Sequence, residues 1–272
     1  MFDFEPVWLQ IKGPRSVNCL TFDANLGTKV ETYKNTMQTH NIQQILNRGR
    51  WFANLPPNLQ QSLLKHGVVR QFQNGQRLFL RGDCADGLYA VLNGSVQIVG
   101  ASKHGAEDKH VILTLIDPPD WFGEICLFDR QPRTHDALAD GPATVFHVRQ
   151  ALLDQLITDN PNYWREFGLL LTQKVRLIFG AIEDAALLPT HMRLARRLLQ
   201  MAEGYGIRSD SSTVSARTLH VSQEKLSAML SISRQTVNQM LKELEHEGLL
   251  QLGRGNIEIL NLEGLKRKAE LI

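Results

Sequence analysis

The stretch from residue 68 to residue 149 most strongly limits the fold that this chain can adopt. Apolar and polar residues alternate through it, and turn-forming pairs interrupt the alternation at Asn74-Gly75, Gly82-Asp83, Asp86-Gly87 and Asn93-Gly94. Alternation with a period of two is typical of strands with one buried face, and such pairs favour tight turns between them. Short strands separated by turns predict an all-β roll or sandwich.

The spacing of apolar residues becomes helical after residue 149. Residues 161–188 predict one long helix with Pro161 in its first turn. Apolar or small residues recur along it at intervals of four and three, which is the pattern of a heptad seam. The seam consists of Trp164, Gly168, Leu171, Val175, Ile178, Ile182 and Ala185.

Two interpretations of this seam are open. The helix either packs on the β-structure of its own chain or forms a parallel two-helix contact with a second copy. Its other side is also apolar, with Leu170, Leu177 and Phe179, so one side can face the roll and the other a partner. For a dimer, we expect the contact residues to be Leu171, Val175, Ile178, Ile182 and Ala185.

Residues 221–260 contain two short predicted helices joined by a tight turn. Ser222 is placed to cap the first helix, over 223–230, and Ser233 to cap the second, over 234–247. Gly248 ends the second helix, and two alternating segments around a Gly-Arg-Gly turn follow it. This order is typical of a helix-turn-helix with a wing.

The second helix of this motif has an exposed polar face that suits a DNA major groove. Arginine pairs with guanine through two hydrogen bonds, while asparagine and glutamine pair with adenine. Serine and threonine hydroxyls near a helix N-terminus bind phosphate oxygens. The predicted DNA-binding residues are Ser222, Ser233, Arg234, Gln235, Thr236, Asn238, Gln239 and Arg254. The alternative is a merely solvated face, which any amphipathic helix has; the wing and the two serine caps favour DNA binding.

Residues 121–137, WFGEICLFDRQPRTHDA, place Glu124 and Arg133 on either side of an apolar run. The two side chains form either a solvated ion pair or two contacts to a small anionic ligand. The local sequence alone leaves both interpretations open.

The three motifs GLYAVLNGSVQIV, DWFGEICLF…PRT and SISRQTVNQMLKELEHEGLL resemble the Crp/Fnr family of bacterial transcription regulators. The similarity extends from about residue 45 to residue 262. It implies an α+β chain with an N-terminal β-roll (a cyclic-nucleotide-binding-like jelly roll), a long dimerisation helix and a C-terminal winged helix-turn-helix. The domains expected from it are an N-terminal extension (1–44), the β-roll (45–158), the dimerisation helix (159–188) and the DNA-binding domain (189–272). It also implies a homodimer on a palindromic DNA operator, with RNA polymerase as a partner.

The resemblance also implies a ligand site. In family members that bind cyclic nucleotides, a Gly-Glu pair and an Arg-Ser/Thr/Ala pair form a phosphate-binding cassette, and here these look like Gly123-Glu124 and Arg133-Thr134. The neighbouring Ile125 is expected to belong to the same cassette. A guanidinium can meet two phosphate oxygens at once, and Glu124 can accept the ribose 2′-hydroxyl. In an empty pocket we expect Arg133 to pair with Glu124, because a buried charge needs a partner.

Several residues depart from the pattern of cyclic-AMP-binding members. His135-Asp136 adds bulk and charge beside the phosphate site, and Ile178-Phe179 stands where a Thr-Ser pair bonds adenine. Cyclic AMP, another cyclic mono- or dinucleotide such as cyclic di-GMP, and no ligand at all therefore stay open as alternatives. On the DNA-reading helix, Arg234-Gln235-x-x-x-Gln239 replaces the Arg-Glu-x-x-x-Arg set with which such members read bases. We therefore predict a half-site that shares the G·C contact of Arg234 with the family consensus and differs from it at the two other contacts.

Other classes of function find less support. The chain has no GxSxG, P-loop or HExxH motif and no cysteine–histidine cluster with metal spacing, so we expect neither an enzyme nor a metal protein. Three distant cysteines argue against a disulfide framework. We expect no signal peptide, no membrane span and a cytoplasmic location. A ligand-independent family member and a winged-helix protein-interaction module remain as alternatives.

Overall fold

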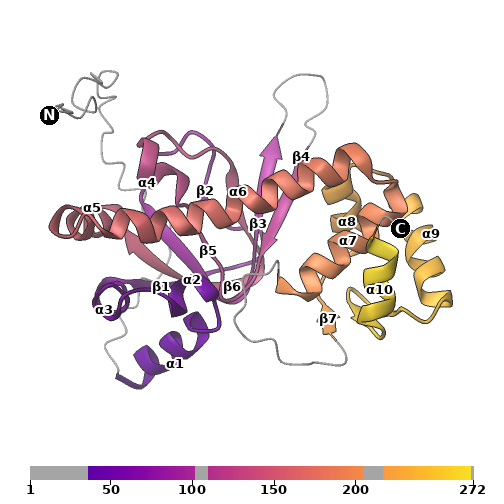
Figure 1. Ribbon diagram of the computed structural model, residues 1–272, viewed down its shortest axis with the longest axis horizontal. Coiled ribbons are helices and arrows are strands. Elements are labelled where there is room, and N and C mark those ends of the chain that lie inside the picture. The colour runs from indigo at the N-terminus through magenta and orange to yellow at the C-terminus, as the bar shows by residue number, and fades with distance from the viewer. Residues whose placement is uncertain (1–35, 102–109, 205–216, 271–272) are drawn as a thin grey trace, which may run out of the picture.

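The computed structural model describes residues 36–101, 110–204 and 217–270. The sequence also predicts an irregular segment over residues 1–40, which falls outside these ranges as far as residue 35. It predicts a charged loop over 103–109, which lies wholly outside them. The described chain has a β-roll, one long helix that crosses it, and a compact group of helices beyond the end of that helix (Figure 1). The predicted α+β architecture is confirmed.

One antiparallel sheet forms the roll. Its strands are β1 (Val68–Phe72), β2 (Arg77–Phe79), β3 (Gly87–Ala101), β4 (His110–Ile116), β5 (Trp121–Phe122) and β6 (Asp136–Arg149). The main path runs β1-β6-β3-β4, while β2 pairs with β6 and β5 pairs with β3. The alternation of the sequence places one set of side chains, including Tyr89, Val91 and Val145, inside the roll.

Short helices flank the sheet. They are α1 (Thr36–Leu46), α2 (Arg50–Ala53), α3 (Pro57–His66), α4 (Ile125–Asp129) and α5 (Gln150–Asp159). Pro56-Pro57 predicts a break between two short helices, and it separates α2 from α3. The sequence did not predict α1 and α4 as separate helices. The expected boundary between residues 44 and 45 falls inside α1, whose last residue, Leu46, is buried in the core beside the roll.

The long helix α6 (Tyr163–Leu187) lies across the roll and leads into the C-terminal helices (Figure 1). Phe167 and Leu170 are buried on the roll, in one cluster with Trp51 and Trp121. Leu170 therefore faces the roll as expected. Phe179 does not, because 67% of its surface is exposed.

The C-terminal part contains a helix-turn-helix with a small sheet. Its elements are α7 (Thr190–Ala202), β7 (Arg217–Leu219), α8 (Gln223–Leu230), α9 (Arg234–His246), β8 (Leu250–Leu252), β9 (Ile257–Ile259) and α10 (Leu262–Ala269). The sheet order is β7-β9-β8, so β8 and β9 form the predicted wing. Helix α10 was not predicted; it packs on α7.

Candidate ligand pocket and nucleic-acid interface

Arg133 is the most deeply buried charged side chain of the predicted cassette, with 2% of its surface exposed. Its Nη1 donates to the carbonyl oxygen of Gly123 at 3.0 Å, and its Nη2 donates to that of Gly87 at 2.6 Å. The guanidinium lies over the ring of Phe79, 4.2 Å from the centroid. A Cβ on Gly123, whose φ is +95°, would stand 2.7 Å from Nη1, so this close approach requires glycine.

The partner of Arg133 is Asp86, not Glu124. Asp86 Oδ1 accepts a hydrogen bond from Arg133 Nη2 at 2.6 Å, so the expected pairing with Glu124 is wrong. Asp86 lies in the turn directly before β3, next to the Gly87 carbonyl that Arg133 also contacts. The turn therefore presents the Asp86 carboxylate and the Gly87 carbonyl together to the guanidinium.

A cluster of polar side chains surrounds the Asp86 carboxylate. Its Oδ2 lies 3.9 Å from Arg70 and 3.5 Å from His147, and it accepts a hydrogen bond from the hydroxyl of Tyr89. Burial lowers the pKa of His147 to about 4, against the smaller opposing effect of Asp86. Among the described residues, none accepts a hydrogen bond from Arg133 Nε. The two terminal nitrogens of the guanidinium make the hydrogen bonds to Gly123, Gly87 and Asp86.

Glu124 is buried, with 5% of its surface exposed, and this burial raises the pKa of its carboxyl group. The nearby ammonium of Lys174, on α6, acts in the opposite direction. Lys174 also lies 3.9 Å from Asp120. Sequence reasoning missed Lys174, whose charge in a mostly apolar helix was the available signal.

Ile125 and Thr134, the other side chains of the cassette, are exposed. Ile125 is 37% exposed, and Thr134 is exposed with its hydroxyl 3.0 Å from Nδ1 of His135. Asp136 accepts from the backbone N–H of Arg81 at 2.7 Å. Burial, followed by the charge of Arg81, lowers the pKa of His135. Of the departures from the family pattern, His135 therefore brings a ring with a lowered pKa and Asp136 a carboxylate that already accepts a hydrogen bond.

Two cysteines can be described. Cys126 on α4 is free and buried, and burial raises its pKa. Cys84, in the turn before β3, is disulfide-bonded.

The two serine caps of the helix-turn-helix form as predicted. Ser222 accepts from the N–H of Lys225 at 3.2 Å, and Ser233 accepts from the N–H of Thr236 at 3.0 Å. The hydroxyls of Ser233 and Thr236 also lie 2.7 Å apart. These bonds fix the N-terminus of α9, which is the end that approaches bases in this class of motif.

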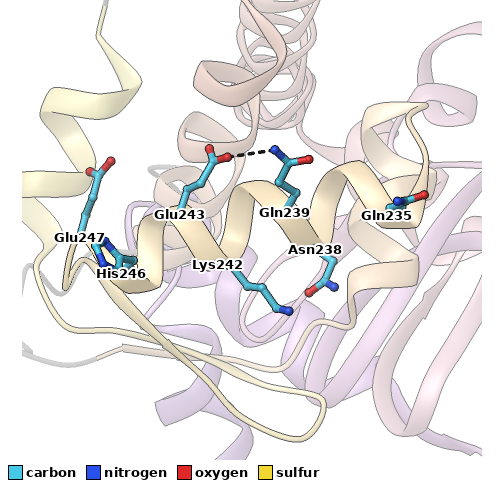
Figure 2. Close-up of a pocket in the computed structure, with 7 residues that line it drawn as sticks. All are labelled: Gln235, Asn238, Gln239, Lys242, Glu243, His246 and Glu247. Atoms are coloured by element: carbon cyan, nitrogen blue, oxygen red, sulfur yellow. Dashed lines mark hydrogen bonds between the residues drawn. The ribbon is translucent and has the colours of Figure 1, made fainter.

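The outer face of α9 is an open polar surface (Figure 2). A hollow of about 520 Å³ lies along it, lined by Gln235, Asn238, Gln239, Lys242, Glu243, His246 and Glu247. Arg234 and, in the wing turn, Arg254 are exposed as well. Arg234, Gln235, Asn238 and Gln239 thus lie at exposed or half-exposed positions of α9, while Arg254 lies in the wing.

Neighbouring side chains orient part of this face. Gln239 donates to Glu243 at 3.2 Å, and Gln223 of α8 donates to Asn238 at 3.3 Å (Figure 2 shows the first contact). Lys242 lies one turn beyond Asn238 and was not predicted; its position i+4 from Asn238 was the available signal. An exposed ammonium on this face is suited to a phosphate.

Some kinds of site do not occur in the part of the chain that the structure describes. Within residues 36–101, 110–204 and 217–270, no three His, Cys, Asp or Glu side chains are arranged to hold a metal ion. No helix in these ranges has the length and apolar character needed to cross a membrane.

Comparison with known proteins assigns both halves of the chain. The family model of the cyclic nucleotide-binding domain matches residues 69–160, which include the Arg133 cassette. The model of the Crp-like helix-turn-helix domain matches residues 192–268, which include α9 and the wing.

Curated relatives and solved structures agree with these matches. A CRP-like cAMP-activated global transcriptional regulator of Mycobacterium tuberculosis is 29% identical over 234 residues, covering 84% of this chain and 100% of that protein. The cAMP-activated global transcriptional regulator CRP of Pasteurella multocida is 26% identical over 188 residues, covering 69% of this chain and 87% of that one.

Among solved structures, FixK2 from Bradyrhizobium japonicum has a TM-score of 0.65 at 17% identity, covering 76% of this chain and 98% of that one. The c-di-GMP-responsive regulator CLP of Xanthomonas campestris has a TM-score of 0.58 at 22% identity, covering 75% and 99%. Both likenesses concern the fold alone. Because a cyclic nucleotide-binding domain and a Crp-like helix-turn-helix follow each other in this order, the chain belongs to the Crp/Fnr family of transcriptional regulators.

Proposed function

We propose that this DNA-binding transcription regulator acts as a homodimer that reads a palindromic operator with two copies of α9. The observation that carries this proposal is the exposed face of α9, where Arg234, Gln235 and Gln239 accompany Asn238 on a helix with a serine cap. A two-fold dimer places two such helices one turn of DNA apart. RNA polymerase is the further partner that a regulator of this kind engages. Since operator DNA and RNA polymerase lie in the bacterial cytoplasm, the proposed location is cytoplasmic.

Arg234 tests the DNA-binding part of the proposal. Arg234→Ala removes a bidentate guanine contact, so specific affinity should fall by about 10- to 100-fold, while non-specific binding changes little. The measurement is fluorescence anisotropy at fixed salt, with an operator selected by the unaltered protein from random duplexes. Arg267→Ala, which removes an exposed arginine of α10, is the matched control. Full specific affinity in Arg234→Ala would contradict the proposed reading residues.

A protein-interaction module is the rival to DNA binding, and salt dependence separates the two. Contacts to Z phosphates give log K a slope of about −0.9Z against log salt. A slope near zero on operator DNA would favour the interaction module. Lys242→Gln should reduce a steep slope by about one contact.

The exposed apolar side of α6 supports a homodimer. Val175, Ile178 and Ile182 have 38%, 55% and 58% of their surfaces exposed in the single chain. Leu171 is half-buried and Ala185 exposed on the same helix. We therefore propose these five residues as the dimer contact, since a side-by-side α6 pair removes their apolar surface from water. The proposed division of the chain is an extension (1–44), a β-roll (45–158), the dimer helix (159–188) and a DNA-binding domain (189–272), with α1 running across the first boundary.

We also propose that an anionic cyclic nucleotide binds the cassette of Gly123, Glu124, Ile125, Arg133 and Thr134. Arg133 supplies a buried cation whose Nε has no acceptor among the described residues, and Glu124 supplies a buried carboxyl group for a ribose hydroxyl. The ligand phosphate would have to share or replace the contact that Asp86 now makes with Arg133. The relatives whose printed names mention cAMP make cyclic AMP one candidate; Ile178 and Phe179, both exposed on α6, offer an adenine no polar partner.

Isothermal titration of the purified protein with cyclic AMP, cyclic GMP and cyclic di-GMP tests this ligand proposal. Arg133→Lys keeps the charge but loses the forked geometry, so it should weaken binding by about tenfold or more while the β-roll stays folded. Absence of heat for all three ligands, with the unaltered protein folded and bound to DNA, would favour a ligand-independent regulator.

A further inference from the structure

Strand β4 connects the two halves of the molecule because its two faces belong to different cores. Leu115, 3% exposed, is part of the core of the C-terminal helices, while its neighbour Ile116, 4% exposed, lies inside the roll. Successive residues of a strand point to opposite faces, which explains the division. A β-bulge opposite Ile98 and Val99 inserts one residue into β4, and Ile112 packs against the same core as Leu115.

An ion pair lies at the same junction. Lys225 Nζ is 2.6 Å from Oδ1 and 2.7 Å from Oδ2 of Asp140, so the ammonium contacts both carboxylate oxygens. Only 11% of the Asp140 side chain and 30% of the Lys225 side chain are exposed. Lys225 belongs to α8, which contacts β4, and Asp140 belongs to β6 of the roll (Figure 1).

The position of Asp140 is fixed by the bend of the sheet. It pairs with Ser95 of β3, beside a register shift, and Gly141 follows it with a φ of +75°. The N–H of Gly141 donates to Asn74 Oδ1 at 2.9 Å. Asp140 is therefore presented by a rigid corner of the roll rather than by a free loop.

The apolar contact and the ion pair have different physical roles. Burial of Leu115 and Ile112 is favourable but non-directional, so it allows the helices to rotate on β4. The ion pair is directional: the Asp140 carboxylate is held at a corner of the roll and binds the partly buried ammonium of Lys225, so only one rotation of the C-terminal helices on β4 preserves it. Helix α9 contacts α8, and Val237 and Leu241 of α9 belong to the same buried core as Leu226 of α8, so fixing α8 also fixes the DNA-reading helix.

We propose that Asp140 and Lys225 are positioning residues for DNA recognition: their ion pair holds the helix-turn-helix against β4 in the orientation that presents α9 to the operator. The proposal rests on the DNA-binding function above. The face that reads DNA stays open in this arrangement, because Gln235, Gln239 and Lys242 are exposed. In a dimer, both α9 helices must meet half-sites about 34 Å apart, so a helix-turn-helix free to rotate binds them less well.

Asp140→Asn tests the proposal because a change of charge and a loss of positioning have opposite effects on affinity for the operator. Removing a negative charge from the roll makes the protein more attractive to phosphates and would strengthen all DNA binding. Loss of positioning instead weakens binding to the operator and leaves binding to scrambled DNA unchanged. The relevant quantity is the ratio of specific to non-specific affinity at one salt concentration.

The experiment measures this ratio for the full chain carrying Asp140→Asn, Lys225→Gln, both changes, or the exchanged pair Asp140→Lys with Lys225→Asp. Each single change should lower the ratio about tenfold, as expected for residues in direct contact. The double neutral variant should lose no more than either single one, and the exchanged pair should recover most of the loss. One base pair added between the half-sites of the operator should weaken binding of the unaltered protein more than it weakens binding of the single variants.

Asp154→Asn, which breaks the exposed Arg130–Asp154 pair at 2.7 Å within the roll and its helices, is the control and should behave as the unaltered protein. Nuclear magnetic relaxation of the DNA-free protein gives a second readout, with one tumbling time for the unaltered chain and two for Asp140→Asn. An unchanged ratio in both single variants, or additive losses in the double variant, would overturn the positioning role. If the unaltered protein selects no operator, the proposal that it reads a palindromic site is contradicted. The relaxation measurement still tests the positioning role in that case, because a single tumbling time in Asp140→Asn would overturn it.

Discussion

The contacts of Arg133 predict a graded order of stability for three variants. The exposed Arg130–Asp154 pair, with side chains 52% and 38% exposed, should contribute about 0.5 kcal/mol to the free energy of unfolding. Asp86 is 43% exposed but bonds a guanidinium that is 2% exposed, so Asp86→Asn should cost about 2 kcal/mol, as for a charge-assisted hydrogen bond. Arg133→Gln leaves two carbonyls and Asp86 without their donor and should cost about 4 kcal/mol.

Tryptophan fluorescence during guanidinium unfolding at pH 7 measures these differences in the roll itself. Trp51 and Trp121 lie 5.3 Å apart in the core beside the sheet, so their emission follows this part of the chain even if the C-terminal helices unfold separately. The midpoint should shift in the order Asp154→Asn, Asp86→Asn, Arg133→Gln, with unchanged slope. Equal midpoints for Asp86→Asn and Asp154→Asn would refute the assignment of Asp86 as the partner of Arg133.

Three further predictions concern other parts of the molecule. Burial lowers the pKa of His147 to about 4, so between about pH 6.5 and pH 4 the imidazole is protonated in the unfolded chain but not in the folded one. The free energy of unfolding should therefore fall by about 3 kcal/mol as the pH drops through this window. Unfolding titrations of His147→Gln should show a smaller dependence on pH. Ser233→Ala removes the cap of α9 and should cost about 1 kcal/mol in thermal unfolding of the C-terminal helices. Ile182→Glu places a charge on the exposed apolar side of α6 and should shift sedimentation equilibrium from dimer to monomer.

Matched variants separate these effects from general damage. Ser227→Ala, which removes a hydroxyl that bonds the Glu224 carbonyl, should change stability by less than about 0.5 kcal/mol. Leu260→Glu, at a residue 47% exposed outside α6, should leave the oligomeric state unchanged. An unaltered pH slope in His147→Gln, or a fully dimeric Ile182→Glu, would contradict the corresponding argument.

The sequence by itself determined the features that depend on neighbours along the chain. Ser222, Ser233 and Gly248 delimit the helices of the helix-turn-helix closely, because caps and left-handed glycines act within one turn. The alternation and turn pairs predicted the strands, and the order of motifs indicated the family. Helices α4 and α10 escaped because neither carries a long periodic pattern.

Only the tertiary structure decided which distant charges meet. Asp86 and Arg133 are separated by 47 residues, and Lys225 and Asp140 by 85, so no local spacing relates them. Their pairing depends on where the register of the sheet and the bend at Gly141 place each carboxylate. The same holds for Lys174 beside Glu124, which depends on how α6 lies across the roll. Side-chain type and local period are encoded residue by residue, whereas the partner of a buried charge is set by the packing of whole elements.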